Sequence, residues 1–213
     1  MQPPKSSVCV LCGVRPATTH DHVPPKGLFK GLGSALVTVP ACFECNNGSS
    51  SDDEDIRAFI SMQIGKQTPG SAHLWDEGAH KSIRRKTALR EQILSTAREA
   101  AISDQDGSLT TRLTVEVPAS VYESVFSRTT RGLYFFHTGR ILSPNARIEV
   151  HPLNVKPYDE FYDGLHQNQI GGQACKYWYQ IANEDPDASI WLYEFYGAHW
   201  IQVSTGAACD DPC

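Results

Sequence analysis

The sequence lacks the features that membrane insertion and export require. No uninterrupted apolar run reaches the roughly 18 residues that cross a bilayer. The N-terminus, MQPPKSSVCVLCG, has no apolar stretch of the about 7–15 residues found in signal peptides. Of the 213 residues, 40% are hydrophobic and 20% are charged, which is typical of a globular protein. We therefore expect a cytoplasmic protein without a membrane partner, built as one large domain or two small ones.

The chain also lacks an excess of positive charge, since its formal net charge is −5 and its isoelectric point is about 5.9. Proteins that bind nucleic acid mainly through phosphate contacts are usually basic, so this balance argues against tight non-specific DNA binding. The charges are unevenly placed: a basic run comprises Lys81, Arg84, Arg85, Lys86 and Arg90, and an acidic run comprises Asp52, Asp53, Glu54 and Asp55. We interpret the acidic run as the first turn of a helix. The basic run is either a DNA-contacting surface or a solvated helix face.

The seven cysteines do not form a pattern typical of a secreted disulfide protein, because their number is odd and the chain is long. Four of them form two C-x-x-C pairs, Cys9 with Cys12 and Cys42 with Cys45. Two such pairs, each closed by a tight turn, can aim four thiolates at one tetrahedral zinc ion. A redox pair would need a strand–helix context that residues 1–15 do not offer. The spacing predicts a structural zinc site, whereas Cys175 is expected in the core.

No internal repeat or low-complexity stretch divides the chain, so its expected organisation rests on changes of pattern. The predicted helices are 51–64, 79–101, 121–136 and 159–167, and the predicted strands are 109–117, 146–153, 174–182, 189–197 and 198–206. We expect an α+β protein. An N-terminal ββα-metal zinc module (1–66) precedes a helical connector (67–108), a β-rich antiparallel region of unknown role (109–206) and a flexible tail (207–213).

The residues around the cysteine pairs resemble a known family. An Asp21-His22 step lies between the pairs, and Asn46 follows the last cysteine directly. This layout resembles the HNH endonucleases, also called ββα-metal or His-Me finger nucleases, and is similar to the phage Holliday-junction resolvase endonuclease VII group. DHVPPK, followed by a Val-Pro-x-C-x-x-C-Asn stretch, also resembles bacterial HNH proteins of unassigned function. The resemblance covers residues 9–60, and RGLYFFHTGR at 131–140 is a less specific match.

The resemblance implies that Asp21 and Asn46 hold a magnesium ion and that His22 activates water. Elementary chemistry agrees, because Mg²⁺ or Mn²⁺ prefers oxygen ligands and a neutral imidazole accepts a proton near pH 7. The zinc would tie residue 45 to residue 12 and so bring Asn46 close to the strand that carries Asp21. One feature of the family has no clear match: the middle Asn is missing from GSALVTVPAC, where Ser34 or Thr38 could substitute.

Strand geometry limits how Asp21 and His22 can share a site, because neighbours on a strand point to opposite faces. Val23-Pro24-Pro25 predicts that the strand ends here, since two prolines prevent regular pairing. His20 would then lie on the face of His22, as a third metal ligand, a phosphate contact or an inert surface residue. Lys26 is a further candidate for a phosphate contact.

Together these patterns predict a metal-dependent endonuclease that hydrolyses phosphodiester bonds, in DNA more than in RNA. The expected cofactors are structural Zn²⁺ and catalytic Mg²⁺ or Mn²⁺. Two alternatives remain at this stage: a non-catalytic zinc module that binds nucleic acid or protein, and a zinc staple for an unrelated C-terminal enzyme. Trp178, Trp191 and Trp200 lie in the C-terminal region, where outward-facing aromatics would serve a homodimer or a protein partner.

Overall fold

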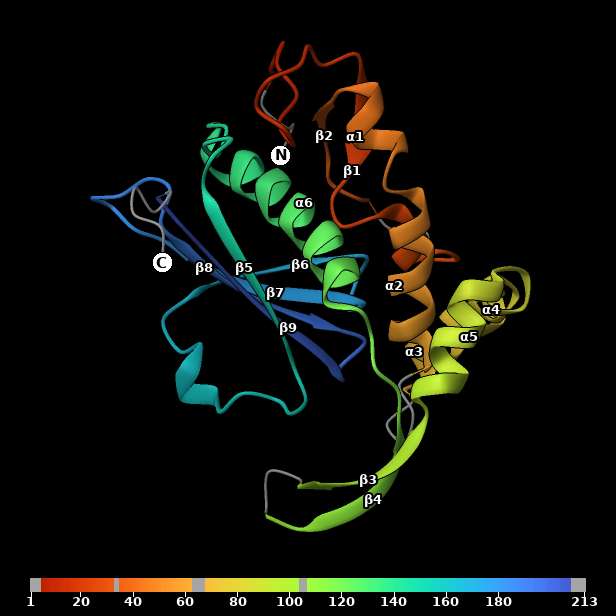
Figure 1. Cartoon of the computed structure of the whole chain (residues 1–213). Coiled ribbons are helices and arrows are strands. Elements are labelled where there is room, and N and C mark those ends of the chain that lie inside the picture. The colour runs from red at the N-terminus through yellow and green to blue at the C-terminus, as the bar shows by residue number, and fades with distance from the viewer. Residues whose placement is uncertain (1–4, 33–34, 63–67, 104–106, 208–213) are drawn as a thin grey trace.

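The computed structural model describes residues 5–32, 35–62, 68–103 and 107–207 and shows the expected α+β fold (Figure 1). Its strands form two separate two-stranded hairpins and one five-stranded antiparallel sheet. No helix among these residues is long and apolar enough to cross a membrane.

The N-terminal part is a small ββα unit. Strands β1 (Thr19–His22) and β2 (Thr38–Ala41) pair antiparallel, and a single 3-10 turn, η1 (Lys26–Phe29), lies between them. Two helices follow, the short α1 (Phe43–Asn47) and the longer α2 (Ser50–Met62). β1 ends immediately before Val23-Pro24-Pro25, as predicted. Ile64, expected on the apolar face of α2, lies outside the described residues.

The middle segment differs from the prediction of one helix over 79–101. It comprises α3 (Pro69–Leu74), a π-helical turn η2 (Trp75–Ala79), α4 (His80–Arg85) and α5 (Thr87–Thr96). The backbone is extended at Lys86, whose ammonium is held by Asp55 and Ser51 of α2, so a tertiary contact interrupts the helical pattern. Residues from 98 onward form β3 (Arg98–Ser103), which pairs with β4 (Leu109–Thr114). The predicted strand over 109–117 therefore ends three residues early.

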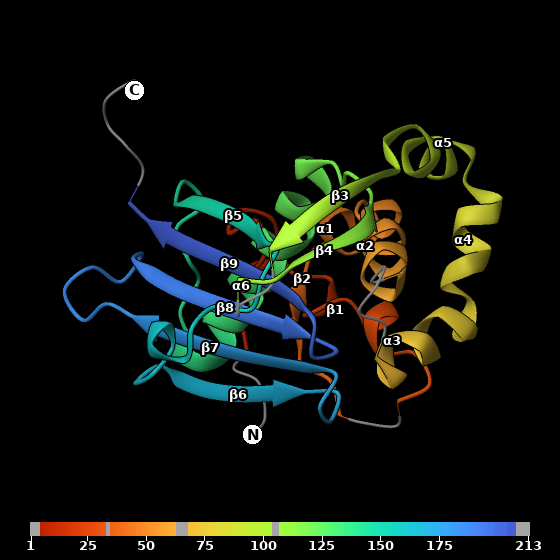
Figure 2. The same ribbon diagram turned by 90° about the horizontal axis from the view of Figure 1, so that it is seen from below.

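The C-terminal part is one long helix against the five-stranded sheet. Helix α6 (Ala119–Thr138) ends at Gly139, whose left-handed backbone (φ 71°) closes the helix. The sheet has the order β5-β9-β8-β7-β6, and Figure 2 shows these strands side by side with α3, α4 and α5 grouped beyond one end. The strands are β5 (Arg147–Leu153), β6 (His166–Ile170), β7 (Cys175–Ile181), β8 (Ser189–Phe195) and β9 (His199–Gly206).

One predicted helix, over 159–167, is wrong. Only a 3-10 turn, η3 (Asp159–Phe161), forms there, and His166 already belongs to edge strand β6. The chain preceding β6 covers the outer face of the sheet, where Tyr162 packs on Trp178 and Trp200. The predicted tight turn near Tyr196–Gly197 is confirmed, because it joins β8 to β9 and both residues have positive φ.

A single apolar core runs through both ends of the chain. It includes Cys9, Val10 and Val39 from the N-terminal part together with Phe126 of α6 and Tyr193 of the sheet. Residues of the predicted zinc module are thus buried together with α6 and the sheet, and the module does not rest on its cysteines alone.

Candidate metal centre and active site

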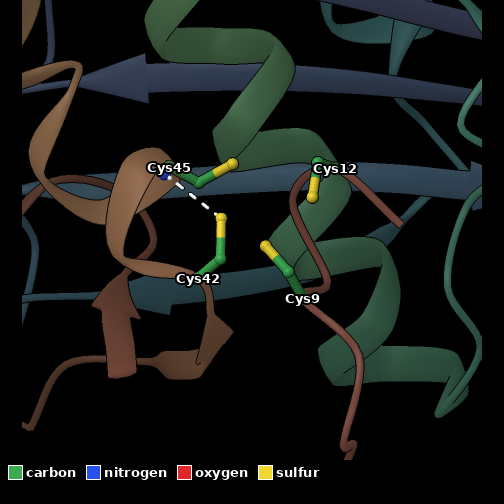
Figure 3. Close-up of side chains that lie close together, drawn as sticks. All are labelled: Cys9, Cys12, Cys42 and Cys45. Atoms are coloured by element: carbon green, nitrogen blue, oxygen red, sulfur yellow. Dashed lines mark hydrogen bonds between the residues drawn. The ribbon is translucent and has the colours of Figure 1, made fainter. Parts of the chain in front are cut away.

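Four cysteines from two distant segments converge at the N-terminal end of the molecule. The sulfur atoms of Cys9, Cys12, Cys42 and Cys45 all lie within 4.8 Å of one another, and Figure 3 shows them facing a common centre. Within the described residues, this is the one group of three or more His, Cys, Asp or Glu side chains that could hold a metal ion. A compact set of four sulfurs suits a tetrahedral ion such as zinc.

In each cysteine turn a backbone amide three residues further along the chain donates to a cysteine sulfur. The amides of Arg15 and Cys45 donate to the sulfurs of Cys12 and Cys42, at 3.5 and 3.4 Å. Gly13 closes the first turn with a left-handed backbone (φ 68°) and donates to the carbonyl of Cys9. Donors aimed at sulfur stabilise thiolates, so these turns are built for metal ligation rather than for neutral thiols.

The charge around the sulfurs supports the same conclusion. Burial raises the pKa of Cys9 and of Cys45, while at Cys12 the backbone donors Arg15 and Val14 outweigh burial and lower the pKa to about 7. The Arg15 guanidinium also contacts the sulfur of Cys42, at 3.6 Å. Four thiols this close together do not all lose their protons readily, because the resulting negative charges repel one another. A cation at their centre would compensate this repulsion and stabilise all four thiolates.

Asp21 lies on β1 with its side chain turned into the protein, 7% exposed. One carboxylate oxygen accepts the backbone N–H of His22 at 2.8 Å, and the other accepts Nη1 of Arg128 at 3.1 Å. Burial raises the pKa of Asp21, although Arg128 and the His22 amide oppose the shift. The carboxylate that the sequence assigns to a divalent cation is thus already paired with a guanidinium.

His22 is half-buried at the last position of β1. Burial and, secondarily, the charge of Lys26 lower the pKa of His22, which keeps its imidazole neutral at pH 7. His20 is exposed, and so is Lys26 at the start of η1. The alternation expected along the strand therefore holds, with Asp21 facing inward between two more accessible histidines.

Asn46 lies against the strand that carries Asp21. Its side-chain amide donates to the hydroxyl of Thr19 at 3.2 Å and to the carbonyl of His20 at 3.1 Å. A backbone carbonyl only accepts, so the NH₂ group of Asn46 must face β1 and its amide oxygen faces away. Asn46 directly follows the cysteine ligand Cys45, and the cysteine cluster therefore fixes where this amide sits. Its free oxygen and the carboxylate of Asp21 are donor types that suit magnesium or manganese.

Two residues of this neighbourhood were missed by sequence reasoning. Arg128 of α6 contacts Asp21 through Nη1 and Asp53 of α2 through Nη2. The acidic run that contains Asp53 could have formed a second cation site, but it was interpreted as the first turn of a helix, and its contact with Arg128 was not expected. Burial raises the pKa of Asp53 to about 6, although Arg128 opposes the shift. No local motif marks Arg128, because it lies 107 residues from Asp21 in the sequence.

The basic run, Cys175 and the C-terminal tryptophans were the other residues for which the sequence raised an expectation. Two members of the basic run are engaged within the protein, since Arg85 pairs with Glu54 at 2.7 Å and Lys86 pairs with Asp55. Cys175 is fully buried, as expected. The three C-terminal tryptophans Trp178, Trp191 and Trp200 are all buried, so none of them offers an outward face to a base or a partner. Ser34, Cys209 and Cys213 lie outside the described residues.

Comparisons of the chain with protein-family models, curated proteins and solved structures find no match.

Proposed function

We propose that the protein is a divalent-metal-dependent endonuclease that hydrolyses phosphodiester bonds in nucleic acid, in DNA more than in RNA, in the cytoplasm. One observation carries the proposal. The second cysteine turn places Asn46 on β1, next to the Asp21-His22 step, although Asn46 is 26 residues from His20 in the sequence. A carboxylate, an amide oxygen and a neutral imidazole on β1 and on the helix beside it are the kinds of group that metal-assisted hydrolysis needs.

Each residue has a separate role in this proposal. Asp21 and the amide oxygen of Asn46 hold Mg²⁺ or Mn²⁺, which when bound supplies a charge sink for the scissile phosphate. His22 takes a proton from the attacking water at a ring nitrogen, because its lowered pKa leaves the imidazole neutral. Zinc on the four cysteines has a structural role. His20 and Lys26, both exposed nearby, are candidates for contacts with the phosphate backbone.

The experiment is a plasmid-nicking assay with Mg²⁺, with Mn²⁺ and with a chelator. We expect His22→Ala to lower the cleavage rate at least about 100-fold, as for loss of a general base, while zinc content and melting temperature stay unchanged. His73→Ala is the matched control, because His73 is a histidine on α3 that has no part in the proposed active site. Cleavage by His22→Ala at the wild-type rate would refute the assignment of the base.

A non-catalytic zinc module that binds nucleic acid or protein is the second candidate. It is favoured by the pairing of Asp21 with Arg128, because a carboxylate held by a guanidinium is not free for a catalytic cation. The same assay separates the two candidates. A wild-type protein that shifts DNA in a gel but never nicks it with either metal has the second function.

A further inference from the structure

Arg128 connects three elements at the proposed cation site. Its guanidinium extends from α6 and contacts Asp21 on β1 and Asp53 on α2. The side chains of Arg128, Asp21 and Asp53 are 14, 10 and 23% exposed. The Nε of Arg128 is buried without a hydrogen-bond partner, so the two carboxylates are the groups that hold this side chain.

The charges of this cluster do not balance. Asp21 and Asp53 face a single guanidinium, and Asp52 adds a further carboxylate whose oxygen accepts the hydroxyl of Ser124 at 2.6 Å. A buried excess of negative charge attracts a cation, and a guanidinium already on Asp21 opposes any cation that approaches the same carboxylate.

We propose that Arg128 is a positioning residue that acts as an internal counter-ion for Asp21 until a divalent cation takes its place. This inference rests on the proposed function, because it concerns the cation site at Asp21. Arg128 contacts Asp21 through Nη1 and Asp53 through Nη2, so the two contacts use different nitrogens of the guanidinium. Asp53 can therefore retain the guanidinium when Asp21 releases it, and Arg128 keeps a carboxylate partner in either state.

The proposal predicts opposite effects at two neighbouring positions. Removing the guanidinium frees Asp21, so R128Q is expected to bind a divalent cation more tightly than the wild type. Removing the carboxylate that retains Arg128 leaves the guanidinium with Asp21 alone, so D53N is expected to bind it more weakly. Because Asp53 acts through Arg128, its substitution matters less once Arg128 is gone.

The experiment measures the Kd of Mn²⁺ for the full-length, zinc-loaded protein by electron paramagnetic resonance, without nucleic acid. We expect R128Q to lower this Kd about tenfold and D53N to raise it about tenfold, as Coulomb interactions at this range allow. In the R128Q background the effect of D53N should shrink to about threefold or less. R128K retains the positive charge but not the two-pronged guanidinium, so its Kd should lie closer to that of the wild type than the Kd of R128Q does.

The matched control is R131Q, which removes another largely buried guanidinium from α6. Arg131 donates to the carbonyls of Leu142, Ser143 and Pro144 and contacts no carboxylate. R131Q should leave the Kd of Mn²⁺ unchanged. If R128Q lacks a cooperative melting transition, D53N decides the test, because it retains the positive charge at residue 128.

The outcomes separate this inference from the proposed function. If D21N abolishes Mn²⁺ binding but R128Q binds no more tightly than the wild type, the counter-ion role is refuted and the cation site stands. Equal effects of D53N with and without Arg128 refute it as well. If the wild type binds no Mn²⁺, both proposals fail. Loss of nicking in His22→Ala bears on the base alone and not on Arg128.

Discussion

The N-terminal hairpin and the C-terminal sheet are stabilised by different means. β1 and β2 are four residues each, and the cysteine cluster joins the chain before β1 to the chain after β2. The sheet has five strands, and Trp191, Tyr177 and Tyr193 are almost wholly buried in it. Short segments cannot bury enough apolar area to fold alone, and a metal ion held by the four cysteines would compensate for that deficit.

This difference determines where the chemistry lies. The metal-stabilised part carries Asp21, His22 and Asn46, while the aromatic part contributes Arg128 through α6. The two parts are not independent, because Val10 and Phe126 belong to the same core. The residues around Asp21 therefore lie between the cysteine cluster and the apolar core. Disrupting either the cysteines or the core should change the position of the Asp21 side chain.

The largest expected effect comes from removing one sulfur of the four-cysteine group. Cys42→Ser should abolish zinc binding and lower the free energy of unfolding by more than about 5 kcal/mol, since structural zinc contributes binding energy directly to folding. Zinc content by atomic absorption and urea unfolding would measure both effects. Cys175→Ser is the control, because Cys175 is buried on β7 and is remote from the sulfurs. The Cys175→Ser protein should have a lower free energy of unfolding than the wild type but should still bind one zinc per chain. A folded Cys42→Ser protein with full zinc would contradict the assignment.

A second prediction concerns the aromatic part and pH. Burial lowers the pKa of His137 and of His199 to about 4, the neighbouring His166 contributing at His137. Both histidines bind protons more readily in the unfolded chain, whose histidine pKa is about 6.5. Their contribution to stability is therefore complete above pH 6.5 and is lost as the pH falls toward 4.

At pH 5 we expect a loss of about 2–3 kcal/mol from the two groups together, after allowance for partial exposure. Calorimetry from pH 7 to pH 5 measures it, with zinc content followed in parallel because acid also releases metal from thiolates. The comparison protein is His137→Asn, which lacks one of the titrating groups. Its stability should fall less steeply with acid. Parallel curves for the two proteins would exclude a contribution from His137.

The smallest expected effect concerns the contact between the two parts. A Cβ added at Gly132 of α6 would lie 2.6–2.9 Å from three side-chain atoms of Val23, just beyond β1. Gly132→Ala should therefore cost about 1–2 kcal/mol through overpacking, although alanine favours helix. Val23→Ala removes the two nearest atoms, so the double variant should recover part of the loss. If the double variant loses as much free energy of unfolding in urea as the two single variants together, this contact does not couple the two parts.

Sequence patterns predicted the elements whose signals are local. The helix predicted over 121–136 is present as α6, and the strands predicted over 189–197 and 198–206 are present as β8 and β9, because their residue patterns are local and no distant contact overrides them. β6 was missed because HQNQI is a largely exposed edge strand with no apolar alternation. The break at Lys86 was missed because its cause is an ion pair with Asp55, 31 residues away.

The residues of the candidate site also fall into two groups: those that sequence spacing identifies and those that only the folded chain brings together. The sequence by itself identified the four cysteines that could hold a metal ion, because the C-x-x-C spacing encodes a turn, and it predicted that Asn46 lies close to β1. Only the tertiary structure decided that Asp21 is paired with Arg128 and that Asp53 shares the guanidinium. Metal-ligand spacing depends on a few consecutive residues. A buried ion pair depends on where α6 packs, and that is decided by the apolar core common to both parts of the chain.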